Sequence, residues 1–271
     1  MRVDLIKIKE DNDYLLECKN YFHENGYLIS NIKNISLINE INENIQNHLN
    51  SKRDIKTNPK IFHYNESPRI VEMWKEIKSV KNLAIHQDII YLLLSLYAKK
   101  PIPFSTINFL KGTEQPLHSD YFHFATKPDG YLAGVWVALE DIHEDSGPLT
   151  IVPGSNNLPY VWLDTLGLEI PKNKNDIKNN YTKYEEYIKK IMIDKKLTVL
   201  TPKLKKGEFL IWSANILHGA GEIKNKNSTR FSQVTHYHFE GCEKYFNPLF
   251  TRLDQNKYGE RDLNAIRIPY G

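Results

Sequence analysis

The chain has 271 residues and a formal net charge of +3, from 36 Lys and Arg against 33 Asp and Glu. The basic residues are interspersed with acidic ones and form no basic stripe, so we expect no nucleic-acid partner. No apolar run approaches the roughly 18 residues of a membrane span, and the N-terminus lacks an apolar signal core, so we expect no membrane association. Two cysteines, Cys18 and Cys242, exclude a disulfide scaffold and favour a cytoplasmic protein.

Helices are predicted for most of the first hundred residues. Apolar side chains recur at helical spacing over residues 13–25, and Gly26 suits the left-handed end of that helix. A short extended segment follows at residues 27–32. Ser36 is then expected to cap a second helix, in which isoleucine and leucine side chains form one apolar stripe.

A polar segment and a third helix complete this N-terminal part. Residues 51–70 contain two prolines and no periodic pattern, which predicts a loop. Residues 79–98 are densely apolar and predict a helix, which Pro101 and Pro103 are expected to end. We therefore expect a helical N-terminal part over about residues 1–100.

From Phe104 the pattern changes to that of β-strands. Runs rich in β-branched and aromatic residues occur at 105–110, 132–139, 149–152, 209–212 and 231–239. Short strands separated by turn residues are typical of a barrel or sandwich. Residues 156–196 interrupt the strands with a Lys-, Asn- and Tyr-rich segment, which predicts a helical, mostly solvent-facing insertion at the rim, where lids often lie. We expect a single domain over residues 1–271, with the β core at about 101–240.

A histidine and an acid two residues apart, His118 and Asp120, indicate a metal site. Alternate side chains of an extended chain point the same way, so both can reach one ion. A third ligand, His218, follows about one hundred residues further on, at the end of another predicted strand. Two histidines and one carboxylate that leave open positions form the facial triad of non-haem Fe(II) oxygenases. The alternative is structural: a loop histidine bonded to a backbone carbonyl, and a buried His218 bonded to a neighbour.

Arg230 and Ser232 lie on one face of the strand that follows His218. A guanidinium and a hydroxyl in this position can bind a carboxylate close to the metal. 2-Oxoglutarate requires such an anchor, because its keto-acid end would occupy two open positions on Fe(II) and leave one for dioxygen. The alternative for Arg230 is a surface salt bridge. His236 and His238, further along this strand, are expected to serve packing or hydrogen bonding, because no carboxylate accompanies them.

Several motifs in a fixed order give the chain a resemblance to a known family. They are His118-Ser119-Asp120, the segments 134–141, 147–149 and 153–155, Leu217-His218-Gly219, and Arg230. With them the chain resembles the phytanoyl-CoA dioxygenase family of Fe(II)/2-oxoglutarate oxygenases over roughly residues 15–240. The resemblance implies a mainly β fold with flanking helices, a double-stranded β-helix of the jelly-roll or cupin-like kind. It also implies His118, Asp120 and His218 as iron ligands and Arg230 as the oxoglutarate anchor.

The resemblance extends to the cosubstrate pocket. Trp136 matches the family's tryptophan that lines this pocket, and a purely structural role in a buried strand is the alternative. Thr106 and Asn108 share a strand face and are expected to reach 2-oxoglutarate or the metal's water, with a structural hydrogen bond as the alternative. Better-known members carry a serine where this chain has Ala220, so Ser232 is expected to supply any hydroxyl.

By the same analogy, the residues that flank the ligands form the substrate side of the pocket. These are Ser119, Tyr121, Phe122 and His123. The expected function is hydroxylation of a small-molecule metabolite or natural-product intermediate, with 2-oxoglutarate and dioxygen consumed and succinate and CO2 released. The sequence is also compatible with two other functions: a cupin-like metal-dependent isomerase or hydrolase that uses no oxoglutarate, and a binding module without catalysis.

Overall fold

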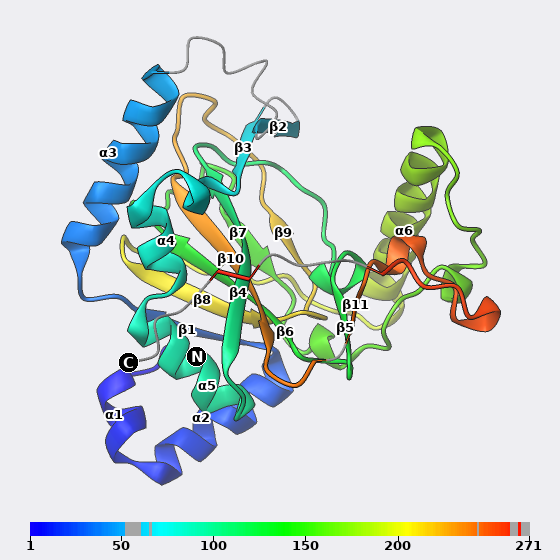
Figure 1. The fold of residues 1–271 in the computed structure, drawn as a ribbon, viewed down its shortest axis with the longest axis horizontal. Helices are drawn as coiled ribbons and strands as arrows, with labels where there is room; N and C mark the ends of the chain where they lie inside the picture. The colour runs from blue at the N-terminus through cyan, green and yellow to red at the C-terminus, as the bar shows by residue number, and fades with distance from the viewer. Residues whose placement is uncertain (52–60, 65–66, 243, 261–264, 267–271) are drawn as a thin grey trace.

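The computed structural model describes residues 1–51, 61–64, 67–242, 244–260 and 265–266 (Figure 1). One large sheet contains β1 (Tyr27–Asn31), β2 (Ile61–Tyr64), β3 (Ser67–Val71), β4 (Pro101–Phe109), β6 (Leu132–Ala138), β8 (Glu208–Ser213) and β10 (Ser232–Phe239). Its strand order is β1-β8-β6-β10-β4-β3-β2, and every pair is antiparallel. The five strands predicted from sequence are thereby confirmed as four members of this sheet and as β7 (Leu149–Ile151).

Two short strand pairs lie outside the large sheet. β5 (Ala125–Lys127) pairs with β11 (Lys244–Phe246), and β7 pairs with β9 (His218–Ala220). The β7–β9 pair brings His218 opposite Ile151. His218 is therefore the first residue of a short strand of its own.

Helices cover one face of the large sheet. They are α1 (Leu5–Glu10), α2 (Asn12–Asn25), α3 (Ile35–Ser51), α4 (Lys78–Ala84) and α5 (Gln87–Tyr97). Successive strand residues point to opposite faces, so Val135 and Val137 of β6 pack into the main hydrophobic core with the helices. Trp136 and Ala138 point the other way, into a second core that includes Leu149 of β7.

The helix boundaries follow from local hydrogen bonds. α2 ends at Gly26, which has φ 78°, so the expected left-handed stop is confirmed. α3 begins at Ile35, one residue before the expected cap, because the side chain of Asn34 accepts a hydrogen bond from the Leu37 backbone N–H. The single helix expected over residues 79–98 is two helices. The chain turns at His86, whose ring caps α5 by accepting from the backbone of Asp88.

The segment 51–70 was expected to be a loop, and the structure corrects this in part. Residues 52–60 and 65–66 lie outside the described residues. Ser51 ends α3, and the other described residues form the edge strand β2 and most of β3, which pairs with β2 and with β4. Pro68 occupies β3 because this strand is short and near an edge.

The expectation of a mainly β fold was wrong in its proportions. Helices contain more of the described residues than strands do, so the fold mixes α-helices with an antiparallel sheet. The insertion contains the longest of the described helices, α6 (Lys174–Asp194), which stands apart from α3 at the opposite end of the molecule (Figure 1). One of its faces is buried and packs Tyr184 and Ile188 into a separate hydrophobic cluster.

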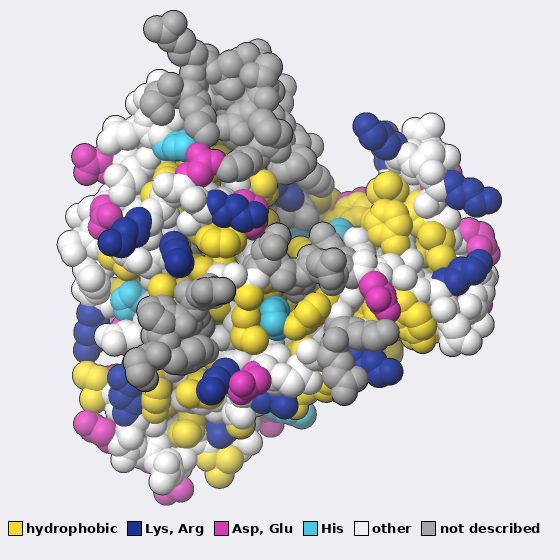
Figure 2. Space-filling model, viewed as in Figure 1, with side chains coloured by type: hydrophobic (Ala, Val, Ile, Leu, Met, Phe, Trp, Pro, Cys, Tyr) yellow, Lys and Arg dark blue, Asp and Glu magenta, His cyan; other side chains and the backbone are white. Residues whose placement is uncertain are grey.

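The described surface agrees with the dispersed charge of the sequence. On the face shown in Figure 2, Lys and Arg side chains are interspersed with Asp and Glu and form no continuous stripe among the described residues. None of the helices within the described ranges combines the length and apolar character that a membrane crossing requires.

Candidate metal centre and active site

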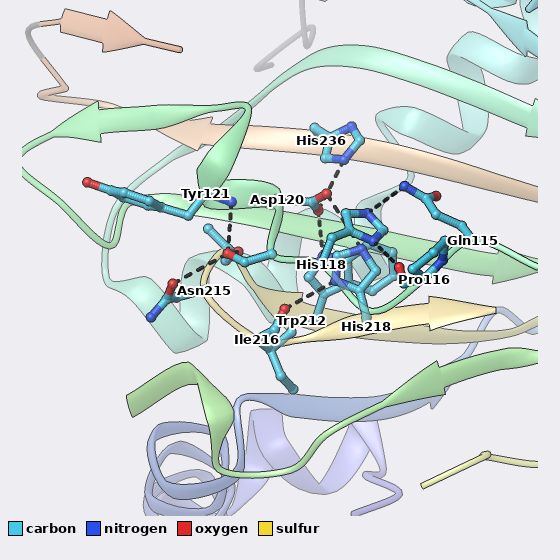
Figure 3. Close-up of polar contacts among 12 residues, drawn as sticks. Gln115, Pro116, His118, Asp120, Tyr121, Trp212, Asn215, Ile216, His218 and His236 are labelled. Atoms are coloured by element: carbon cyan, nitrogen blue, oxygen red, sulfur yellow. Dashed lines mark hydrogen bonds and ion pairs between the residues drawn. The ribbon is translucent and has the colours of Figure 1, made fainter. Parts of the chain in front are cut away.

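The backbone holds the two ligand histidines side by side. His118 lies in the loop after β4 and forms an isolated antiparallel bridge with His218 of β9. Each histidine donates its backbone N–H to the carbonyl of the other, at 2.9 Å in both directions. Their ring centroids are consequently 4.4 Å apart (Figure 3).

Asp120 joins them through the turn that follows His118. Ser119 is extended, with φ −108° and ψ 134°, so the side chains on either side of it point the same way. Its hydroxyl then accepts from the Tyr121 backbone N–H at 3.2 Å and starts the 3-10 helix η2 (Asp120–Phe122). One ligand atom from each of His118, Asp120 and His218 lies within 4.8 Å of the others, and all three residues are buried.

The two histidines are held with the same nitrogen facing the site. Nδ1 of His118 is 3.0 Å from the Pro116 carbonyl oxygen, and Nδ1 of His218 is 3.2 Å from that of Ile216 (Figure 3). A carbonyl only accepts, so we assign the proton to Nδ1 in both rings. Each Nε2 then presents a lone pair, as metal-binding imidazoles require.

The charge states of the three ligands also suit a divalent cation. Burial lowers the pKa of His118 well below its usual range, and burial likewise lowers that of His218. Burial opposes ionisation of Asp120, but the neighbouring imidazoles of His218 and His236 hold its pKa below the usual range. Two neutral imidazoles and one carboxylate are the protonation states in which these groups bind a metal, so the donor set fits Fe(II).

Asp120 has two further partners on its other oxygen. Trp212 of β8 donates its indole N–H to Oδ2 at 2.8 Å, and Nε2 of His236 on β10 lies 3.2 Å from the same oxygen. Oδ1 faces the histidine pair instead, 3.5 Å from Nε2 of His218. His236 was expected to serve packing or hydrogen bonding because no carboxylate accompanies it in the sequence. The contact fits hydrogen bonding, but its partner is the Asp120 carboxylate, so the reason given was wrong.

The triad opens into a pocket of about 370 Å³ between the large sheet and the β7–β9 pair. Besides the triad, its walls include Trp136, Phe109 and Arg230. Arg230 is 3% exposed, and its guanidinium carbon lies 5.2 Å from the centroid of the Phe109 ring. Nη1 donates to the Gly147 carbonyl at 2.9 Å. Burial and then the charge of Arg69 lower the pKa of Arg230 to about 10, which still leaves it cationic at neutral pH.

Thr106 and Asn108 do not reach this pocket. On β4 the pocket is lined by Ile107 and Phe109, so the alternation along the strand directs Thr106 and Asn108 to the opposite face. There the Asn108 amide donates to Gln233, which in turn donates to the Val80 carbonyl of α4. Neither side chain lines the pocket in which 2-oxoglutarate was expected, and Asn108 makes the structural hydrogen bond that was the alternative.

Most of the residues expected on the substrate side also point elsewhere. Tyr121 donates to Asp129 at 2.6 Å, and the ring of Phe122 stacks on Tyr184 of α6. The hydroxyl of Ser119 donates to the Ala214 carbonyl at 2.9 Å. These three residues anchor the turn that carries Asp120, and of the four expected residues only His123 lines the pocket.

Ser232 is buried on the same strand face as Arg230, opposite Phe109. Its hydroxyl contacts the Arg230 carbonyl oxygen at 3.5 Å and is absent from the pocket wall. Sequence reasoning missed Arg69 and Gln115, which line the pocket and are joined by a 2.7 Å hydrogen bond. Arg69 belongs to β3, and the polar segment around it gave no periodic signal.

Comparison with known proteins identifies the class. The model of the family described as phytanoyl-CoA dioxygenase (PhyH) matches residues 37–231. The chain belongs to this family and is an Fe(II)/2-oxoglutarate-dependent oxygenase with the facial triad His118, Asp120 and His218.

The individual relatives are distant. Phytanoyl-CoA dioxygenase, peroxisomal, from Bos taurus is 20% identical over 295 residues, which cover 97% of this chain and 79% of that protein. A probable phytanoyl-CoA dioxygenase from Caenorhabditis elegans is 20% identical over 219 residues, which cover 80% of this chain and 62% of that protein.

Solved structures show the same fold at low identity. The α-ketoglutarate-dependent epimerase SnoN of nogalamycin biosynthesis matches with a TM-score of 0.66 and 18% identity, over 96% of this chain and 98% of that one. EctD from S. alaskensis, solved with bound Fe, matches with a TM-score of 0.64 and 14% identity, over 94% of this chain and 87% of that one. SnoN has also been solved with Fe3+ and α-ketoglutarate.

Proposed function

We propose that the chain hydroxylates a small-molecule metabolite or natural-product intermediate, in a reaction that converts 2-oxoglutarate and dioxygen to succinate and CO2. One oxygen atom enters succinate and the other enters the hydroxylated product, so the reaction balances. The observation that carries the proposal is a buried cation, Arg230, in the same pocket as the metal triad. We also propose that the large sheet and the β7–β9 pair form a double-stranded β-helix.

In this proposal the triad binds Fe(II), which when bound supplies the oxidising chemistry. His118, Asp120 and His218 would hold the ion at the wall of the pocket, where the organic molecules could reach it. Arg230 pairs with the distal carboxylate of 2-oxoglutarate, and its contact with Gly147 fixes the direction of the guanidinium.

The remaining pocket residues orient the organic molecules and exclude water. Trp136 forms an apolar wall for the cosubstrate, and His123 and Phe124 lie where a substrate would approach. The carbonyl-bound Nδ1 atoms hold both histidine rings in place, and the Gln115 amide, which lies 3.1 Å from Nε2 of His118, would move aside for the metal.

The proposal is tested by adding Fe(II) and 2-oxoglutarate to protein purified without oxygen. The protein with bound Fe(II) and 2-oxoglutarate should give a weak visible charge-transfer band. When oxygen is admitted, the protein should release succinate even without substrate. The Asp120→Ala variant should give neither signal, whereas Asp13→Ala, an exposed acid on α2, should behave as wild type.

A metal-binding wild type without a band or succinate would contradict the oxygenase proposal and favour an isomerase or hydrolase that uses no oxoglutarate. A wild type that binds no metal would favour a binding module. If the wild type gives both signals, a screen of candidate metabolites for stimulated succinate release would identify the substrate.

A further inference from the structure

Three strands place three residues in one row across the large sheet. Gly134 of β6 is directly opposite Trp212 on β8 and directly opposite His236 on β10. Trp212 and His236 are thus separated by a single position, which carries no side chain. The row lies on the sheet face that forms the pocket, since both flanking side chains line it.

The indole of Trp212 occupies the space that a side chain at position 134 would fill. A Cβ atom at this position would lie 2.3 Å from Cε2, 2.4 Å from Nε1 and 2.6 Å from Cζ2 of Trp212. These distances are far below van der Waals contact, so the indole lies across the backbone of β6 at this point. Gly134 has no positive φ, so its importance here is one of space alone.

Both side chains of the row meet the same oxygen of Asp120. The indole N–H donates to Oδ2 at 2.8 Å, and Nε2 of His236 approaches Oδ2 at 3.2 Å (Figure 3). Among the described residues, Nδ1 of His236 has no hydrogen-bond partner. An ionised carboxylate only accepts, so the His236 proton belongs on Nε2, and Oδ2 receives two donors.

We infer that Trp212 and His236 are positioning residues that hold Asp120 by Oδ2 and leave Oδ1 alone to bind the metal. The inference rests on the proposed metal site. Rotation of the carboxylate toward bidentate binding would break both contacts, which is costly because Asp120, Trp212 and His236 are all buried. With Oδ2 held by these two donors, Oδ1 alone would be available to a metal ion, as a triad that leaves open positions requires.

The test measures Mn(II) binding in the absence of oxoglutarate, by the loss of the free-ion EPR signal. Trp212→Phe and His236→Leu each remove one donor, and each should raise the Mn(II) dissociation constant roughly tenfold or more. His236→Gln can still place an N–H near the position of Nε2 and should stay within about threefold of wild type. Gly134→Ala should resemble Trp212→Phe, because the new methyl group displaces the indole.

The control is Trp74→Phe. Trp74 also donates its indole N–H to a carboxylate, that of Glu72 at 2.9 Å, but it lies in the helical layer and outside the pocket. This variant should bind Mn(II) as wild type does. Loss of a tryptophan–carboxylate bond in general is thereby separated from loss of this particular one.

A second readout reports on the electronic role of the two donors. Removing them leaves more charge on the Asp120 carboxylate, so the visible band with Fe(II) and 2-oxoglutarate should move to longer wavelength in Trp212→Phe and His236→Leu. Circular dichroism without metal checks that the variants fold, and if Trp212→Phe does not, the His236→Leu and His236→Gln pair decides the matter.

The outcomes separate the inference from the proposed function. A wild type that fails to bind Mn(II) would contradict the metal site itself. A wild type that binds, together with Trp212→Phe and His236→Leu variants that bind within twofold of it, would overturn the positioning role. Equal losses in His236→Leu and His236→Gln would also overturn it for His236.

Discussion

Arg230 carries its charge in an almost fully buried position, which costs free energy unless the charge is paired and hydrogen-bonded. The guanidinium rests on the Phe109 ring, and one of its amino groups donates to a backbone carbonyl. In the described residues its Nε has no hydrogen-bond partner. A buried cation with spare donors, next to a metal triad, is what a carboxylate ligand would satisfy.

Replacement of Arg230 by Met should therefore weaken 2-oxoglutarate binding. Hydrogen bonds to charged groups contribute about 1.5–3 kcal/mol, so we expect the dissociation constant to rise roughly 10- to 100-fold. The visible band, titrated with 2-oxoglutarate on Fe(II)-loaded protein, measures it. Arg2→Met, which alters an exposed pair with Glu208, is the control. An unchanged constant in Arg230→Met would show that the anchor lies elsewhere.

At this scale the sequence predicted chemical types well and strand faces poorly. The triad was predictable because His118 and Asp120 are two residues apart and His218 is also a residue type that binds metals. Thr106 and Asn108 were misplaced because alternation tells which residues share a face, whereas the position of the helices decides which face is covered. The contact between Trp212 and Gly134 could not be predicted, because it depends on strand pairing.

At the scale of elements, the α6 insertion is part of the metal site's support. Tyr184 of α6 accepts a hydrogen bond from the Ser119 backbone N–H at 2.7 Å. Its ring stacks on Phe122 with centroids 3.9 Å apart. The helix was expected to be mostly exposed, and only Asn180, Tyr184 and Ile188 of it are buried. Its buried face holds the turn that presents Asp120.

Tyr184→Phe should loosen that turn while preserving the stack. The buried Ser119 N–H would lose its partner, at a cost of about 1–3 kcal/mol in the free energy of unfolding. We also expect a severalfold weaker affinity for Mn(II). Urea unfolding and metal titration measure the two effects, with Tyr187→Phe on the same helix as the control. Wild-type values in Tyr184→Phe would mean that α6 does not support the site.

The burial of His238 should make the stability of the protein depend on pH. His238 is buried on β10, and its Nδ1 is 2.9 Å from the Tyr245 hydroxyl. Burial lowers the pKa of His238 to about 4. Its ordinary value is about 6.5, so between these pH values the unfolded chain binds a proton that the folded protein does not. This contribution to stability is complete above pH 6.5 and is lost as the pH falls toward 4.

The contribution of His238 is at most about 3 kcal/mol. Urea unfolding at several pH values from 7 to 4.5 should show the free energy of unfolding falling more steeply in wild type than in His238→Gln. Other groups titrate in both proteins, so the difference between the two curves isolates His238. Parallel curves would contradict the assignment.

At the scale of the whole molecule, the metal site joins segments that are far apart in the sequence. His118 and Asp120 follow β4, whereas His218 belongs to β9, and β8 and β10 supply the groups around Asp120. A bound ion would therefore connect the large sheet to the β7–β9 pair. The single domain over residues 1–271 and the cytoplasmic location stay predictions.

Metal binding should accordingly stabilise the entire fold. A metal at one hundred times its dissociation constant adds about 2.7 kcal/mol to the free energy of unfolding, which corresponds to a rise in Tm of roughly 5 °C for a chain of this size. Thermal unfolding with and without Mn(II) measures the rise. Asp120→Ala should unfold at the same temperature under both conditions, and a similar rise in that variant would place the metal elsewhere.

The sequence by itself determined the chemistry of the site: two imidazoles, a carboxylate and a guanidinium, with strands around them. These follow from residue type and local spacing, which the backbone period converts into shared faces. Only the tertiary structure decided which oxygen of Asp120 faces the two ligand histidines, and that Trp212 and His236 meet over Gly134. Those contacts depend on the order and register of strands distant in sequence, which the packing of the whole sheet fixes.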